Sequence, residues 1–288
     1  MQKFTELPED LHKVIIAFTS NKVFDLSIVS KYFNIHVFNL RIREIKHNQF
    51  PKMKDEHLLK LINLASLDLS YNNSITNASL EKLANLTSLK LRYNRVITNS
   101  ALEKLTKLAS LNLGYNDSIT DVSLEKLVNL TSLNLSYNKM ITDSSLKNLV
   151  NLTSLDLYGN NIITNSSLEK RINLASLDLS YNNRITNSAL EKLVNLTSLN
   201  LCGNRVITNS ALEKLVNLTS LELYGNNYIT SSSLEKLVNL ASLDLSYNRV
   251  ITNSALEKLV NLTSLNLSSN RVIADAAFKN LANLKIIR

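Results

Sequence analysis

Few residues of this chain could do covalent or metal chemistry, and their spacing does not favour it. The four histidines all lie in residues 1–62, and none stands at metal-ligand spacing from a cysteine or a carboxylate. Cys202 is the single cysteine. Its sequence neighbourhood offers no histidine, and Arg205 is the only basic side chain nearby that could lower the pKa of the thiol. No glycine-rich loop that could hold a phosphate occurs. We therefore predict a protein that is not an enzyme and needs neither a cofactor nor a metal.

The polar residues that could bind a ligand recur every 22 residues, in a unit that runs ten times without a gap from Asn63 to Ala282. With Asn63 as position 1, position 6 carries five acids and one lysine, whereas position 11 carries five basic residues and one acid. Position 6 reads Asp68, Lys90, Asn112, Asn134, Asp156, Asp178, Asn200, Glu222, Asp244 and Asn266. The charged residues of position 11 are Arg95, Asp117, Lys139, Arg205, Arg249 and Arg271. Electrostatic complementarity predicts that a basic ligand segment lies along the acidic row.

Some units depart from the common pattern at positions that could contact a ligand. The second unit carries Lys90, Arg92 and Tyr93, and tyrosine replaces serine at position 8 in two others. Aromatic residues and arginine are frequent anchors of interfaces. The predicted target-binding residues are Asp68, Lys90, Arg92, Tyr93, Asp156, Tyr158, Asp178, Glu222, Tyr224 and Asp244. The alternative is that these departures are neutral variation on a solvated sheet.

The apolar pattern of the unit predicts the elements that position these residues. Positions 2, 5 and 7 are apolar, and residues 66–70 alternate polar residues with leucine, as in a half-buried strand. Thr76 or Asn77 can cap a following short helix, in which Leu80 and Leu83 share one face. A unit of this kind buries its apolar face only against its neighbours, so the array is a solenoid with one long surface for recognition.

Position 10 is asparagine in all ten units. A turn after a strand leaves backbone groups unpaired, and a buried asparagine side chain can both donate to them and accept from them. Stacked units predict a continuous ladder of these amides, whereas an exposed turn asparagine is the alternative. The ladder residues are Asn72, Asn94, Asn116, Asn138, Asn160, Asn182, Asn204, Asn226, Asn248 and Asn270.

Two residues interrupt the apolar pattern. Arg171 stands where other units carry the second helical leucine, and an unpaired buried guanidinium is too costly. We therefore expect its guanidinium to reach solvent and Ile172 to fill the gap. Phe278 replaces leucine in the last unit, and residues 284–288 follow without a polar closing cap, which predicts a fragile or covered C-terminal end.

The spacing Leu-x-x-Leu-x-Leu-x-x-Asn over residues 63–282 resembles the leucine-rich repeat family. The second half of the unit is similar to the cysteine-containing subtype of that family, with asparagine where the subtype usually has cysteine. The resemblance implies an α/β fold, a right-handed horseshoe-shaped solenoid. Its parallel sheet would lie on the concave side, where ligands usually bind, and its short helices on the convex side.

Residues 7–40 have the apolar spacing of short helices, and three such helices would form a small bundle. This stretch resembles the F-box, although the tryptophan common near the end of that family is missing and Phe38 stands as its substitute. The residues that carry the resemblance are Leu7-Pro8-Glu9, Leu11, Ile15, Asp25-Leu26, Val29-Ser30-Lys31 and Tyr32-Phe33. The F-box implies docking on the Skp-family adaptor of cullin-RING ubiquitin ligases. The residues implied in that docking are Leu7, Pro8, Leu11, Ile15, Ile16, Leu26 and Val29.

We thus predict an F-box-like helical head over residues 1–54 and a repeat array over residues 55–288, with ten full repeats and a partial repeat at each end. The predicted function is a substrate receptor of a Skp-cullin-F-box ubiquitin ligase, whose head docks the adaptor and whose repeats hold an unknown target protein. The alternative is an interaction scaffold in which the head only caps the array. Nucleic-acid binding is less favoured, although the net charge of +8 points mildly to an anionic partner.

The location follows from cysteine usage and hydropathy. A single cysteine fits a reducing compartment. The N-terminal residues lack the pattern of a secretory signal, and no apolar run is long enough to span a membrane. We predict the cytoplasm or nucleus, or a host's cytoplasm if the chain comes from a virus or an intracellular bacterium.

Overall fold

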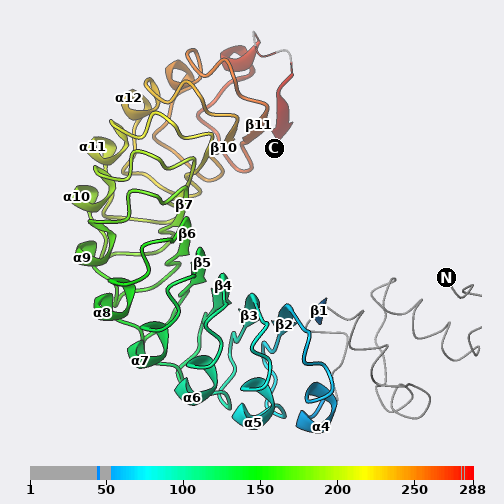
Figure 1. The fold of residues 1–288 in the computed structure, drawn as a ribbon. Helices are drawn as coiled ribbons and strands as arrows, with labels where there is room; N and C mark the ends of the chain where they lie inside the picture. The colour runs from blue at the N-terminus through cyan, green and yellow to red at the C-terminus, as the bar shows by residue number, and fades with distance from the viewer. Residues whose placement is uncertain (1–43, 46–52, 280, 282) are drawn as a thin grey trace, which may run out of the picture. The chain divides into compact units, whose positions relative to one another are not determined.

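The computed structural model describes residues 44–45, 53–279, 281 and 283–288. The F-box-like helices, and with them every predicted adaptor-docking residue from Leu7 to Val29, lie outside the described residues. The chain divides into two units, residues 1–130 and 131–288, each of which stacks its repeats in chain order (Figure 1). None of the helices that the structure describes is long and apolar enough to cross a membrane.

In the first unit a short strand and a four-residue helix alternate. The elements are β1 (Glu44–Ile45), α4 (Asp55–Leu58), β2 (Ser66–Asp68), α5 (Asn77–Leu80), β3 (Ser88–Lys90), α6 (Asn99–Leu102), β4 (Ser110–Asn112) and α7 (Asp121–Leu124). The strands pair in parallel, with Leu67 opposite Leu89 and Leu89 opposite Leu111. Ile45 pairs with Leu67 at the same 22-residue offset, although sequence reasoning assigns residue 45 to the head.

The second unit repeats the same pattern. Its elements are β5 (Ser132–Asn134), α8 (Asp143–Leu146), β6 (Ser154–Asp156), α9 (Asn165–Leu168), β7 (Ser176–Asp178), α10 (Asn187–Leu190), β8 (Ser198–Asn200), α11 (Asn209–Leu212), β9 (Ser220–Glu222), α12 (Ser231–Leu234), β10 (Ser242–Asp244), η2 (Asn253–Ala255), β11 (Ser264–Asn266), η3 (Asp275–Phe278) and β12 (Lys285–Ile287). All successive pairs from β5 to β12 are parallel. The two η elements are 3-10 helices, which replace the α-helical turns of the earlier repeats.

The core of most repeats is a stack of six apolar side chains, as the sequence predicts; Arg171 takes the sixth place in the repeat that begins at Asn151. In the repeat that begins at Asn129 they are Leu130, Leu133, Leu135, Ile141, Leu146 and Leu149, each at most 1% exposed. Strand leucines face the helices across this core, so the polar side chains of the strands are left on the outer face of the sheet. The predicted α/β solenoid, with a parallel sheet and short helices, is confirmed.

Position-10 asparagines tie each repeat to the one before it. The Asn204 side chain donates from Nδ2 to the carbonyl oxygens of Leu179 (3.1 Å) and Asn182 (2.6 Å). Its Oδ1 accepts from the backbone N–H groups of Val206 (3.0 Å) and Ile207 (2.9 Å). The ladder therefore runs from side chain to backbone, not from amide to amide. The fully buried members are Asn94, Asn116, Asn138, Asn160, Asn182, Asn204, Asn226 and Asn248.

A second ladder, which sequence reasoning missed, joins the repeats at the start of the helices. Asn187 at position 15 accepts from the backbone N–H of Thr208 (2.9 Å) and donates to the hydroxyls of Thr208 (2.7 Å) and Ser210 (2.8 Å). Thr76 is the N-cap of α5 and accepts from the N–H of Ala78 (3.3 Å), which decides between the two predicted caps. Asn187 thus holds the next repeat, whereas Thr76 caps its own helix.

The prediction for Arg171 is wrong. Its side chain is buried, with 4% exposed, and Ile172 is the exposed residue, at 56%. The backbone N–H of Arg171 donates to Leu168 (2.9 Å) in the same turn that points leucine inward in other repeats. Nε donates to the carbonyl of Ser167 (3.2 Å), but Nη1 has no hydrogen-bond partner among the described residues. Desolvation lowers the pKa of this guanidinium.

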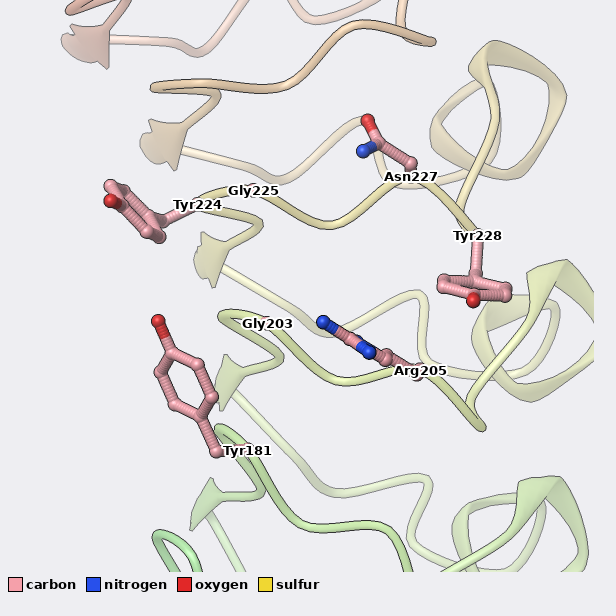
Figure 2. A pocket seen from close by; sticks show the side chains of 7 residues that line it. All are labelled: Tyr181, Gly203, Arg205, Tyr224, Gly225, Asn227 and Tyr228. Atoms are coloured by element: carbon pink, nitrogen blue, oxygen red, sulfur yellow. The ribbon is translucent and has the colours of Figure 1, made fainter.

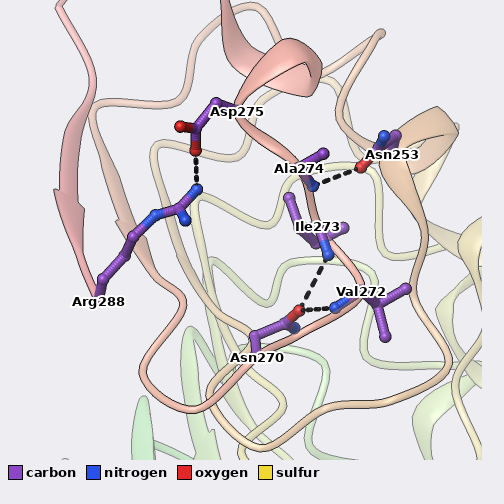
Figure 3. A network of polar contacts seen from close by, with 7 residues as sticks. All are labelled: Asn253, Asn270, Val272, Ile273, Ala274, Asp275 and Arg288. Carbon is purple, nitrogen blue, oxygen red and sulfur yellow. Dashed lines mark hydrogen bonds and ion pairs between the residues drawn. The ribbon is translucent and has the colours of Figure 1, made fainter.

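The C-terminal end continues the sheet with a shortened repeat. Ser264 pairs with Lys285, an offset of 21 residues where the other described pairs of the second unit have 22. Asn270 still accepts from the N–H groups of Val272 and Ile273, as Figure 3 shows. Arg288 forms an ion pair with Asp275, and its guanidinium lies 5.7 Å from the ring centre of Phe278. Ile287 of β12 remains 47% exposed.

Candidate binding face

The residue before each ladder asparagine, at position 9, has a left-handed backbone in all ten repeats, with φ between 51° and 58°. This conformation favours glycine, and it costs a residue with a Cβ about 1–2 kcal/mol. Yet tyrosine occupies the position six times and glycine only three times. The tyrosines are Tyr71, Tyr93, Tyr115, Tyr137, Tyr181 and Tyr247. The sequence analysis treated Tyr93 as an exception. The exchange of tyrosine and glycine at position 9 could have indicated a left-handed backbone there.

In the first unit these tyrosines stack on one another. The ring centres of Tyr71 and Tyr93 are 4.8 Å apart, and those of Tyr93 and Tyr115 are 4.4 Å apart. The guanidinium of Arg92 lies 5.4 Å from the centre of the Tyr93 ring and 5.2 Å from that of Tyr115, within cation–π range. Lys90 Nζ lies 3.9 Å from Asp68 Oδ2. The structure thus brings the predicted pair Arg92 and Tyr93 together, in a cluster with two further rings.

In the second unit the tyrosine row alternates between positions 8 and 9. Tyr137 packs edge-on against Tyr158 (4.9 Å between ring centres), and Tyr158 against Tyr181 (5.7 Å). The repeat with Tyr158 at position 8 carries Gly159 at position 9, where a Cβ atom would lie 2.5 Å from the Tyr137 ring. Glycine therefore admits the ring of the preceding repeat. Another repeat also has tyrosine at position 8 (Tyr224) and glycine at position 9 (Gly225). The ring centres of Tyr224 and Tyr247 are 5.2 Å apart.

Position-6 residues, predicted only as ligand contacts, also hold the strand ends in place. Asp178 Oδ1 accepts from the backbone N–H of Ser180 (2.8 Å), and its Oδ2 accepts from Nδ2 of Asn200 (3.1 Å). The same bond to position 8 is made by Asp68, Asp156 and Asp244. Each of these carboxylates keeps part of its surface for a ligand, because its side chain is only half-buried.

Glu222 and Cys202 lie next to each other on this face. Cys202 Sγ lies 3.8 Å from Glu222 Oε2, to which it donates. Desolvation, and next the charges of Asp178 and Asp244, raise the pKa of Glu222. Burial raises the pKa of the Cys202 thiol to about 12, so the thiolate that nucleophilic chemistry requires is not formed near neutral pH. No group of three metal-ligating side chains occurs within the described part of the chain.

The side chains of the second unit therefore form three rows: acids at position 6, tyrosines at positions 8 and 9, and basic residues at position 11. We call these four positions together the binding face. Four acids form the first row: Asp156, Asp178, Glu222 and Asp244. Four exposed basic residues form the third: Lys139, Arg205, Arg249 and Arg271. The tyrosines of positions 8 and 9 stand between these rows in sequence. The acids of position 6 and the basic residues of position 11, which the sequence separates, are thus accessible to a ligand.

Comparison with solved structures places the fold among known proteins. An internalin (InlF) of Listeria monocytogenes is 26% identical, over 97% of this chain and 94% of its own, with a TM-score of 0.56. The yeast Rad7–Elc1 complex contains a chain that is 20% identical, over 85% of this chain and 74% of its own, with a TM-score of 0.64. TLR13 in its complex with ssRNA13 is 26% identical, over 85% of this chain and 38% of its own, with a TM-score of 0.61.

The family comparison matches the repeat period itself. A model described as Leucine Rich repeat matches residues 60–84, 82–106, 104–128, 126–150, 148–170, 172–194, 238–260 and 259–282. A second model, described as Leucine Rich repeats (2 copies), matches residues 194–237. No F-box match was found, and a comparison with curated proteins gave no match. With its 22-residue strand–turn–helix units, buried leucines and position-10 asparagines, the chain belongs to the leucine-rich repeat family.

Proposed function

We propose that this chain is a non-enzymatic receptor that holds a protein partner on its binding face. The observation that carries the proposal is the tyrosine row at a backbone position that favours glycine. Because glycine occupies the same position in three repeats without loss of the turn, tyrosine is not required for the fold. Residues held in strained conformations on a surface point to a function for their side chains.

The rings are exposed in a manner suited to protein recognition. Tyr71 is 54% exposed, Tyr181 46% and Tyr247 50%, so the row offers aromatic surface to solvent. Tyrosine supplies a large rigid contact area and a polar hydroxyl, and it loses little conformational entropy when it is fixed. A row of such side chains favours a protein segment that runs along the stacked repeats.

The charge rows of the second unit define the chemistry of that segment. Its basic groups would face the acids of position 6, and its acidic groups would face the arginines and lysine of position 11. The partner is therefore a segment of mixed charge. This arrangement does not favour a nucleic acid, whose phosphates would meet the acidic row beside the basic one.

This proposal predicts that loss of two rings weakens binding strongly. Replacing Tyr158 and Tyr247 with serine, which other repeats carry at positions 8 and 9, should weaken binding by about tenfold or more, because buried aromatic anchors dominate interface energies. The measurement uses random 16-residue peptides selected by display on the wild-type chain, with affinities determined by calorimetry.

The matched control replaces Lys192 and Lys214, exposed side chains on the helix side, with serine. Peptides should bind this control variant as tightly as the wild type. Equal binding to the tyrosine-depleted variant would place the recognition surface elsewhere and contradict the proposal.

We propose further that residues 1–54 recruit a ubiquitin ligase and that the repeats present its substrate. Support comes from the sequence: the Leu7-Pro8 start and the Val29-Ser30-Lys31 segment resemble the F-box, and an array of leucine-rich repeats follows them. The alternative assigns these apolar residues to a small core that caps the array. In both hypotheses, the ligase-recruiting head and the capping head, the partner binds on the binding face.

Calorimetry with a Skp-family adaptor separates these two readings. The full-length chain should bind the adaptor with a submicromolar dissociation constant, about −8 kcal/mol or better. A full-length variant with Leu7, Pro8 and Leu26 changed to serine should lose about 100-fold in affinity, because anchor residues carry most of such an interface. Its circular dichroism should match the wild type. A folded wild-type chain that gives no binding would reduce the head to a cap.

A further inference from the structure

The tyrosine row of the second unit is interrupted between Tyr181 and Tyr224. The intervening repeat carries Cys202 and Gly203 at positions 8 and 9, where its neighbours carry a tyrosine at one position or the other. Tyr158 and Tyr181 are in contact, as are Tyr224 and Tyr247, but the row lacks the ring that would join these two pairs. The interruption therefore spans one repeat and lacks one ring.

A pocket of about 570 Å³ lies at this interruption. Figure 2 shows Tyr181 and Tyr224 on the strand side, with the hydroxyl of Tyr181 pointing toward Tyr224. Gly203 and Gly225 line the pocket between the tyrosines and the edge loop. All these residues belong to three successive repeats of the second unit.

The glycines show which group is missing. A Cβ at Gly203 would lie 2.6 Å from the Tyr181 ring, so the ring of the preceding repeat fills the space above that glycine. Gly159 has the same relation to Tyr137. A Cβ at Gly225 would meet nothing within 4 Å, because the preceding repeat has Gly203 in place of a tyrosine. The space above Gly225 therefore corresponds to the space that the preceding tyrosine ring fills above Gly159 and Gly203.

The loop side of the pocket offers hydrogen-bond donors. Arg205 extends toward the two tyrosines in Figure 2, and within the described part of the chain its side chain makes no ion pair or hydrogen bond. Asn227 uses Oδ1 to accept from the backbone N–H of Arg249 (3.2 Å), which leaves the N–H groups of Nδ2 for a ligand. Tyr228, 49% exposed, completes this side. None of the lining residues is acidic.

We propose that this pocket accepts a tyrosine side chain of the protein partner, which completes the interrupted row. The ring would take the place above Gly225 and contact Tyr181 and Tyr224, as neighbouring rings of the row contact each other at 4.9–5.7 Å. Its phenol oxygen would accept from Arg205 or Asn227, which favours tyrosine over phenylalanine. The proposal rests on the proposed function, because it names one side chain of the segment that the binding face holds.

The chain itself provides a variant that closes the pocket. Changing Cys202 to serine and Gly203 to tyrosine gives the Ser-Tyr pair found at residues 180–181 and 246–247. Gly203 has a φ of 57°, within the range of the six position-9 tyrosines, so the backbone already accepts this residue. The Tyr181 ring would have to move to stack on the new ring, as Tyr71 stacks on Tyr93.

The test is a titration of the full-length chain with N-acetyl-L-tyrosinamide, followed by ligand-observed NMR. We expect saturable binding to the wild type, several-fold weaker binding of N-acetyl-L-phenylalaninamide and none of N-acetyl-L-leucinamide. The pocket-filled variant C202S/G203Y should weaken tyrosinamide binding about tenfold or more. The control Ser269→Tyr, which adds a tyrosine at position 9 of the last repeat, should bind as the wild type does.

Three outcomes would overturn the proposal: no saturable tyrosinamide binding, equal binding of the leucine compound, or binding that the filled variant retains. The display-selected peptides distinguish this failure from failure of the binding face. Peptides that bind wild type and C202S/G203Y equally, but lose affinity for the Tyr158/Tyr247 variant, would leave the binding face standing without the pocket. Neither Tyr158 nor Tyr247 lines the pocket, although each ring packs against a tyrosine that does, so the two sets of variants remove different residues of one row.

Discussion

Replacing Asn204 with alanine should lower the free energy of unfolding by about 3–5 kcal/mol. The substitution removes four hydrogen bonds at a fully buried site and leaves the N–H groups of Val206 and Ile207, and the carbonyls of Leu179 and Asn182, without this partner. Each unsatisfied buried group costs about 1–3 kcal/mol, and local relaxation recovers part of the sum. Urea denaturation followed by circular dichroism measures the effect.

The matched control is Asn183→Ala, an exposed asparagine one residue beyond the ladder of the preceding repeat. It should change stability by less than about 0.5 kcal/mol, as exposed substitutions usually do. A loss below about 1 kcal/mol in the Asn204 variant would show that water replaces the ladder bonds, and that packing alone fixes the turn.

Replacing Arg171 with leucine should raise the free energy of unfolding by about 2–4 kcal/mol. The wild-type guanidinium is buried with Nη1 unpartnered, and exchange of an uncompensated buried charge for an apolar side chain is stabilising by this order. Leucine at the same position is fully buried in neighbouring repeats, as Leu149 and Leu193 show. The measurement is the same urea titration.

Lys170→Leu is the control, because it removes one positive charge from the adjacent exposed position. It should leave stability nearly unchanged. Destabilisation by Arg171→Leu would contradict the prediction.

The sequence predicted those features that follow from the period of one repeat. The spacing of Leu130, Leu133 and Leu135 dictates which residues enter the core, and asparagine at every position 10 marked the turn that needs its amide. Strand and helix positions follow from the same pattern, since each unit repeats the same local preferences. The leucine-rich repeat fold was therefore within reach of sequence reasoning alone.

Features that depend on the packing of one repeat against the next were missed. Arg171 was expected in solvent from its charge, but the turn that points position 21 inward outweighs the preference of one side chain. The second ladder at Asn187 and the role of Asp178 at the strand end depend on contacts between side chains and backbone that spacing does not reveal. The pocket was not predicted for a related reason. It forms because no ring stands at Gly203, and the sequence of one repeat does not show which neighbouring ring would fill that space.

The two ladders also have a genetic consequence. The hydrogen bonds described above from Asn204 and Asn187 to other repeats join residues 21 to 25 positions apart, and thus reach only the adjacent repeat. Unequal recombination between near-identical copies could insert or delete one whole unit and recreate the same joints on both sides of the change. Such an event would alter the number and order of tyrosines on the binding face while the scaffold keeps its contacts. The array can therefore change what it recognises by copy number, without any point mutation in its core.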